Sequence, residues 1–136
     1  MKLHHNGIEV ALCDEWWAEA HMGAFFPVAP TYRVNLKSAK GRKGFQVAIR
    51  AIGPVIRSPG TGIFNGSENG SARERVVSIL AGFKSNDAIP PVKVVRQAAG
   101  SQFPYKLTAG VHRLYCSLAV GYTHVPAIDG FDWSTL

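Results

Sequence analysis

Long apolar runs and paired cysteines are both missing from this sequence of 136 residues. No stretch approaches the roughly 18 consecutive apolar residues of a membrane helix, so no membrane partner is expected. Residues 1–5 lack the apolar core and cleavage site of a secretory signal, which predicts a cytoplasmic protein. Cys13 and Cys116 form no Cys-x-x-Cys motif and stand among apolar neighbours, which predicts buried thiols that act as small hydrophobes.

Acidic residues are absent from residues 33–57, which hold seven of the fifteen Lys and Arg residues. The rest of the chain has eight cations against nine acids, so the net charge of +6 originates in this segment. A dense basic segment attracts nucleic acid or phosphorylated ligands. One interpretation is therefore a DNA partner contacted by Lys40, Arg42 and Lys43. The other is a solvated surface loop that keeps the protein soluble.

Metal-ligand spacing is also missing, because His4, His5 and His21 are not combined with cysteines or carboxylates as a zinc site requires. No metal site is expected. Trp16, Trp17 and the Phe25-Phe26 pair have two interpretations. They are either core residues or a surface for a protein partner or for base stacking.

The chain length fits one hydrophobic core. Residues 1–44 are interpreted as an N-terminal extension packed on a main domain of residues 45–136. The extension is predicted to contain a strand at 7–12, a helix at 15–20 capped by Asp14, an edge strand at 32–36 and a basic turn at 37–44.

The main domain is predicted from alternating and helical apolar patterns. The segment 58–70 is rich in glycine and is expected to be a loop, and Ser71-Ala72-Arg73-Glu74 has the spacing of a capping box. The expected elements are strands at 45–49, 52–56, 92–96, 105–109 and 123–128, with helices at 72–83 and from Gly110 to Gly121. This order predicts an α+β fold, a small mixed sheet with helices packed against it.

The turn Gly110-Val111-His112-Arg113 stands where a strand passes directly into a helix. The start of a helix presents unpaired N–H groups and the positive end of its dipole to an anion. His112 can donate a hydrogen bond, and Arg113 offers a planar fork that matches phosphate oxygens. The pattern favours phosphate binding, and pairing of Arg113 with a carboxylate is the alternative.

Three segments, residues 89–95, 105–116 and 125–128, resemble the sulfiredoxin/ParB-like superfamily in order and spacing. The Pro90-Pro91 strand entry and the Gly-x-His-Arg turn carry the resemblance, which covers roughly residues 52–128. It implies a ParB/sulfiredoxin-like domain that binds a nucleoside triphosphate, to which Mg²⁺ could be bound.

In sulfiredoxins the corresponding turn is Gly-Cys-His-Arg, and its cysteine is the nucleophile. This chain has Val111 there, so it is not expected to be a sulfiredoxin. Cys116 lies more than a helical turn further on and is expected to face the core. The resemblance implies that the nucleotide is bound by Arg75, Ser78, Gly110, Val111, His112 and Arg113, with Gly82 where the family has a third helix residue that bears a hydroxyl.

ParB-type relatives bind CTP and carry a DNA-binding domain after this fold. Only eight residues follow Ile128, so no such domain is expected within this sequence. Other relatives that consist of this domain alone are ATPases, nucleases or small-molecule kinases.

The predicted function is therefore binding of ATP or CTP phosphates, with phosphotransfer or hydrolysis as the activity if the protein is an enzyme. Glu74 and His112 are the candidate catalytic residues, and Glu68 is a further carboxylate that could act as a base or hold Mg²⁺. One alternative is a nucleic-acid-binding protein or nuclease. A second is a non-catalytic interaction module that binds a protein through Trp16 and Trp17.

Overall fold

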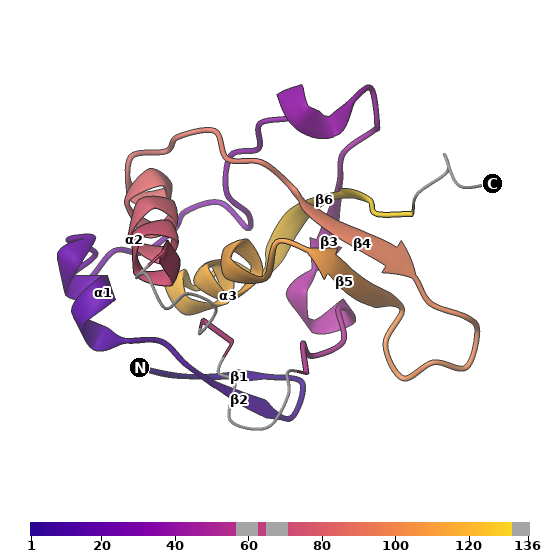
Figure 1. Cartoon of the computed structure of the whole chain (residues 1–136), viewed down its shortest axis with the longest axis horizontal. Coiled ribbons are helices and arrows are strands. Elements are labelled where there is room, and N and C mark those ends of the chain that lie inside the picture. Colours follow the sequence, from indigo (N-terminus) through magenta and orange to yellow (C-terminus); the bar gives the residue numbers. More distant parts are fainter. Residues whose placement is uncertain (57–62, 65–70, 132–136) are drawn as a thin grey trace.

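The computed structural model describes residues 1–56, 63–64 and 71–131, and Figure 1 shows its arrangement. The chain begins with an antiparallel hairpin of β1 (Lys2–His5) and β2 (Ile8–Ala11). Asn6 and Gly7 join the strands with φ angles of 49° and 89°. A two-residue hairpin turn of type I′ needs positive φ at both central residues, which Asn-Gly supplies. The single strand predicted at 7–12 is therefore one arm of a hairpin.

The main sheet has four strands in the order β3-β6-β4-β5. Strand β6 is antiparallel to β3 and parallel to β4, and β4 is antiparallel to β5. The strands are β3 (Phe45–Ala48), β4 (Val92–Arg96), β5 (Tyr105–Ala109) and β6 (His124–Asp129). This small mixed sheet with helices beside it confirms the predicted α+β class.

Three α-helices are described: α1 (Asp14–Glu19), α2 (Ser71–Lys84) and α3 (Val111–Val120). Helix α3 packs on the sheet through β4 and β6, α2 packs on α3, and α1 packs on α2 (Figure 1). Within the described residues, no helix combines the length and apolar character needed to cross a bilayer. Asp14 does not cap α1 as predicted: it is the first residue of the helix, Cys13 is the N-cap, and the Asp14 carboxylate binds the Met1 ammonium group at 2.6 Å.

Two of the predicted strands do not form. Residues 32–36 make a single bridge, between Val34 and Ile89. Ile89 is followed by Pro90 and Pro91, which have no N–H group with which to continue the pairing. Residues 52–56 likewise make one bridge, from Ile52 to Tyr105, and Pro54 ends the pairing two residues later. The structure has short 3₁₀ helices, η1 (Lys37–Ala39) and η2 (Ile49–Ala51), near these segments.

Side chains from both sides of residue 44 share one hydrophobic core. The proposed domain boundary stays a prediction. Trp16, Trp17 and Phe25 are half-buried and pack against this core, whereas Phe26 is 84% exposed. The core includes Leu3, Val10, Leu12, Met22, Val47, Val76, Leu80, Val92, Leu114, Tyr115 and Val125.

The buried side chain of His5 connects the hairpin to α3. Its Nδ1 lies 2.8 Å from the Tyr115 hydroxyl and its Nε2 lies 3.0 Å from the Ile49 carbonyl oxygen. Only an Nε2–H can donate to a carbonyl, so Nδ1 accepts from Tyr115. Burial lowers the pKa of His5, and its hydrogen bonds to Ile49 and Ile52 offset part of that effect. His5 is a structural residue.

The two cysteines differ. Cys116 is fully buried, and burial raises the pKa of its thiol, which confirms the sequence prediction. Cys13 is only half-buried, because it is the N-cap residue of α1 at the edge of the core. The predicted loop at 58–70, including Glu68, lies outside the described residues except for Ile63 and Phe64, and so does the side chain of Ser71 in the predicted capping box.

Candidate functional site

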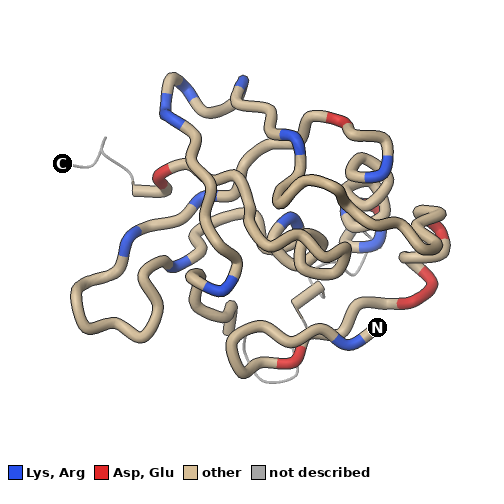
Figure 2. Tube along the Cα trace, turned by 180° about the vertical axis from the view of Figure 1, so that it is seen from behind, with Lys and Arg blue, Asp and Glu red and all other residues tan. Residues whose placement is uncertain are grey.

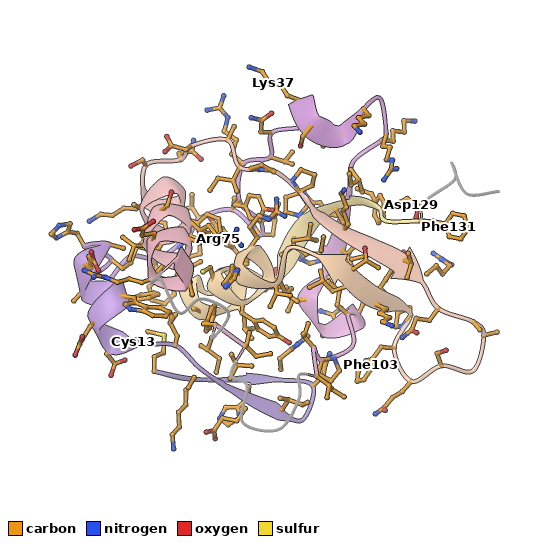
Figure 3. The ribbon with its side chains drawn as sticks, in the orientation of Figure 1. Cys13, Lys37, Arg75, Phe103, Asp129 and Phe131 are labelled. Carbon is orange, nitrogen blue, oxygen red and sulfur yellow. The ribbon has the colours of Figure 1, made fainter. Side chains whose placement is uncertain are left out.

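A cavity of about 620 Å³ lies between α2 and the start of α3. This volume falls in the range of small-molecule sites, roughly 300 to 1,000 Å³. Arg75 lies where α2 faces α3 (Figure 3). The lining residues are Glu74, Arg75, Ser78 and Ile79 from α2, and Gly110, Val111, His112 and Arg113 from the turn into α3.

Helix α2 packs one face against the hydrophobic core, and a neighbouring face lines the cavity. Val76, Leu80 and Phe83 are buried and recur at helical spacing. Arg75 and Ser78 lie beside this apolar stripe, three residues apart and therefore on neighbouring positions of the surface. Arg75 and Ser78 therefore line the same cavity as the Gly110 turn.

Gly110 sets the distance between strand and helix. Its φ of 99° and ψ of 32° lie in the left-handed region, which glycine adopts without strain. A Cβ at this position would stand 2.8 Å from Cγ1 of Val92 and 3.0 Å from its Cβ. Only glycine fits here, and this tight turn aims the first turn of α3 into the cavity.

The first turn of α3 gives the cavity a positive end. Val111, His112 and Arg113 are the first three residues of a ten-residue helix. N–H groups at this position have no acceptor within the helix, and the helix dipole adds a partial positive charge. All three residues are half-buried. An anion in the cavity would therefore face backbone donors in a partly dehydrated setting, where their attraction is stronger.

His112 is held by aromatic contacts. Its ring centroid lies 5.8 Å from that of Phe64, which is itself edge-to-face with Trp16 at 6.4 Å. Nε2 of His112 is buried. These contacts restrict the imidazole to a narrow set of orientations at the cavity wall.

The cavity contains two guanidinium groups. Among the described residues, Arg75 and Arg113 form no ion pair. Arg73, on the same helix, binds both carboxylate oxygens of Glu19 at 2.7 and 2.8 Å and joins α1 to α2. Burial raises the pKa of Tyr32, and the nearby charge of Arg113 lowers it by a smaller amount. The carboxylate pairing considered for Arg113 is thus not present in the described part of the chain.

Glu74 is the acid that lines this cavity, and it is exposed. No group of three His, Cys, Asp or Glu side chains among the described residues could hold a metal by itself. Mg²⁺ in nucleotide sites is commonly held by one or two carboxylates together with the phosphates. Glu74 fits that limited role.

The described wall of the cavity has no thiol. Val111 lines the cavity where the resemblance would place a cysteine, and Cys116 is buried in the core. The chemistry left to these residues is anion binding and proton transfer through Glu74 and His112.

The predicted nucleic-acid contacts lie elsewhere. Lys40, Arg42 and Lys43 do not line this cavity. Arg42 instead donates from Nη1 to the Asp129 carbonyl oxygen at 2.7 Å, at the end of β6. Figure 2 shows Lys and Arg positions spread over several parts of the chain. These three cations therefore do not share the cavity of the Gly110 turn.

Comparisons with known proteins give no relative. No protein-family model matches this sequence, and searches of curated proteins and of solved structures find no match. The resemblance to the sulfiredoxin/ParB-like superfamily therefore stays a prediction.

Two residues of the site were not identified from the sequence. Ile79 lines the cavity and Phe64 supports His112. Ile79 belongs to the apolar positions of α2 and carries no sign of a surface role. Phe64 stands in a glycine-rich segment whose composition predicts only a loop, so nothing links it to His112, which is 48 positions further along.

Proposed function

We propose that this protein binds a nucleoside triphosphate in the cavity between α2 and α3. One observation carries the proposal: Arg75, Ser78 and the Gly110–Arg113 turn, far apart in sequence, line one cavity of about 620 Å³. This combination of two cations, a hydroxyl and a helix start suits a chain of phosphates.

Each group has a distinct role in the proposal. The N–H groups of the first turn of α3 and the guanidinium of Arg113 bind one phosphate, and Arg75 binds the next from the opposite wall. The Ser78 hydroxyl donates to a phosphate oxygen. Loss of one charge-assisted hydrogen bond costs about 1.5 to 3 kcal/mol, which corresponds to roughly 10- to 150-fold weaker binding.

The proposed reaction is transfer of a phosphoryl group to water or to a small acceptor. Glu74 accepts the proton of the attacking hydroxyl, and His112 donates to a phosphate oxygen as negative charge builds there. Mg²⁺, held through Glu74 and the phosphates, would neutralise part of that charge. ATP and CTP are the nucleotides that the resemblance suggests.

A non-catalytic interaction module is the second candidate. The substitution of valine for the family's nucleophile at position 111 favours it, since the fold then keeps its turn without its known chemistry. The half-buried Trp16, which contacts Phe64 beside the cavity, links a surface for a protein partner to the same site.

A melting scan with ATP, CTP, GTP and inorganic phosphate, each with and without Mg²⁺, tests the proposal. A ligand at 100 times its Kd stabilises the folded state by about 2.7 kcal/mol, which raises the Tm by roughly 10 °C for a chain of this size. Arg75→Gln and Arg113→Ala should reduce the shift. Arg50→Gln, an exposed arginine outside the cavity, is the matched control. No shift with any nucleotide would contradict nucleotide binding.

A phosphate-release assay separates binding from catalysis. Glu74→Gln should retain the nucleotide-dependent Tm shift and lose turnover. A normal shift with no turnover in the wild type would identify the protein as a non-catalytic nucleotide-binding module.

A further inference from the structure

A second cavity of about 350 Å³ lies on the sheet, away from the Gly110 turn. Phe45 of β3, Val94 and Arg96 of β4, Tyr105 of β5 and Asp129 of β6 line it, so all four strands contribute. We call it the sheet groove. It shares no residue with the α2–α3 cavity.

Strand register explains why these residues meet. Arg96 stands directly opposite Tyr105, and Asp129 pairs with Val94. Side chains of paired residues project from the same face of a sheet. Val94, which is 1% exposed, forms the floor of the groove, and the aromatic and charged side chains form its walls.

The walls combine aromatic rings with a cation. The rings of Phe45 and Tyr105 lie 6.3 Å apart at an interplanar angle of 36°. The Arg96 guanidinium carbon lies 5.5 Å from the Tyr105 ring centroid, and Nη2 donates to the Tyr105 hydroxyl at 3.2 Å. Phe45 is 38% exposed. Arg96 therefore holds the Tyr105 ring in place, while part of the Phe45 side chain stays exposed to a ligand.

The charges around the groove select an anionic ligand with a neutral planar part. The Arg42 side chain reaches the groove through its hydrogen bond to the Asp129 carbonyl oxygen. Lys43 is the next residue in the chain and lies two positions before Phe45. Among the described acids, Asp129 alone belongs to the four-stranded sheet, and Figure 3 shows it at the end of β6 near Phe131. Figure 2 shows the other acids toward the helices and the N-terminal hairpin.

We propose that the sheet groove binds single-stranded nucleic acid, with one base against Phe45 and Tyr105 and the flanking phosphates at Arg96, Arg42 and Lys43. Many proteins bind single strands by stacking aromatic side chains on the bases and placing cationic side chains along the phosphates. Such stacking tolerates any sequence, since every base has a π face. The Asp129 carboxylate accepts the Phe131 N–H at 2.9 Å, and its negative charge repels a phosphate from the groove itself. A duplex fits less well, because its bases are stacked inside.

Fluorescence anisotropy tests the proposal with a labelled single-stranded DNA of mixed sequence, the RNA of the same sequence and the matching DNA duplex. The single strands should bind more tightly than the duplex, and the DNA to RNA ratio identifies the natural ligand. Phe45→Leu keeps an apolar side chain and removes the ring, and should weaken binding about 5- to 150-fold. Phe26→Leu, at an exposed phenylalanine outside the groove, should have no effect.

The charge contribution is measured separately. Arg96→Gln should weaken binding and lower the slope of log affinity against log salt by about 0.7, the loss of one phosphate contact. The Arg113→Ala variant should bind the single strand as tightly as the wild type does, and excess ATP should not displace the strand. The two proposals can therefore fail independently of each other. Equal binding of duplex and single strand, no binding at low salt, or equal effects of Phe45→Leu and Phe26→Leu would each overturn the proposal.

Discussion

Gly110 lies so close to Val92 that a methyl group on its α-carbon would stand 2.8 Å from Cγ1 of the valine. Real Cβ atoms do not approach a carbon this closely, so the turn into α3 depends on glycine for space as well as for its φ of 99°. Gly121, at the other end of α3, has the same φ of 99° but only a distant neighbour, Pro27, at 4.0 Å. A side chain at Gly121 would therefore cause backbone strain alone, whereas one at Gly110 would cause the same strain and a clash with Val92.

Gly110→Ala should lower the free energy of unfolding by about 2 to 4 kcal/mol, the sum of backbone strain of roughly 1 kcal/mol and overpacking of roughly 1 to 3 kcal/mol. Gly121→Ala should cost only the strain. Urea denaturation of both variants measures the difference. Equal losses would show that Val92 yields and that the close contact does not define the turn.

The burial of His5 predicts a pH dependence of stability. The pKa of His5 is lowered in the folded state, so the unfolded chain takes up the proton first as the pH falls below the ordinary value of 6.5. His5 should therefore destabilise the protein progressively below about pH 6.5 and leave stability unaffected above it. Melting scans from about pH 7 to about pH 5 should show a smaller decline in His5→Asn, whereas His4→Gln, at an exposed histidine, keeps the full decline.

The Tyr115 hydroxyl also accepts from the Val55 N–H at 3.1 Å while it donates to His5. Tyr115→Phe removes both bonds and leaves the buried His5 Nδ1 and the part-buried Val55 N–H without that partner. We expect a loss of about 1 to 3 kcal/mol in urea denaturation. A loss below about 0.5 kcal/mol would mean that the hairpin is held to α3 by apolar packing alone.

Cysteine alkylation reports on the core. Cys116 is fully buried and burial raises its pKa, whereas Cys13 is half-buried. Iodoacetamide at about pH 8 should label Cys13 in the native protein and both thiols only in denaturant, since the thiolate is the reactive form. Mass spectrometry of the peptides counts the labels. Rapid native labelling of Cys116 would contradict the packing of α3.

How far the sequence predicts this fold depends on the element. The apolar periodicity of α2 and α3 predicts both helices to within about one residue, because each buries one face against the core. The segments 32–36 and 52–56 have the alternation of strands and fail to form them. The prolines that follow each single bridge, at positions 90 and 54, remove the N–H groups that a ladder needs.

The candidate site shows the same division. A strand that ends in glycine before a helix marks the Gly110 turn from sequence, whereas Arg75 and Ser78 are assigned by matching the apolar stripe of α2 to the family that the sequence resembles. The sheet groove escapes such reasoning, because Phe45, Arg96 and Asp129 come from strands whose order is set by tertiary pairing. Charge composition predicts that residues 33–57 attract anions, and only the structure shows that Arg42 reaches the end of β6.

We propose that Arg75 and Arg113 hold the phosphates of one nucleotide across the α2–α3 cavity. Isothermal titration with the nucleotide that gives the largest Tm shift, and with its nucleoside, tests this most directly. We expect the wild type to bind the triphosphate and to bind the nucleoside far more weakly. Arg75→Gln and Arg113→Ala should each weaken triphosphate binding roughly 10- to 150-fold. Equal affinities in the wild type and both variants would contradict it.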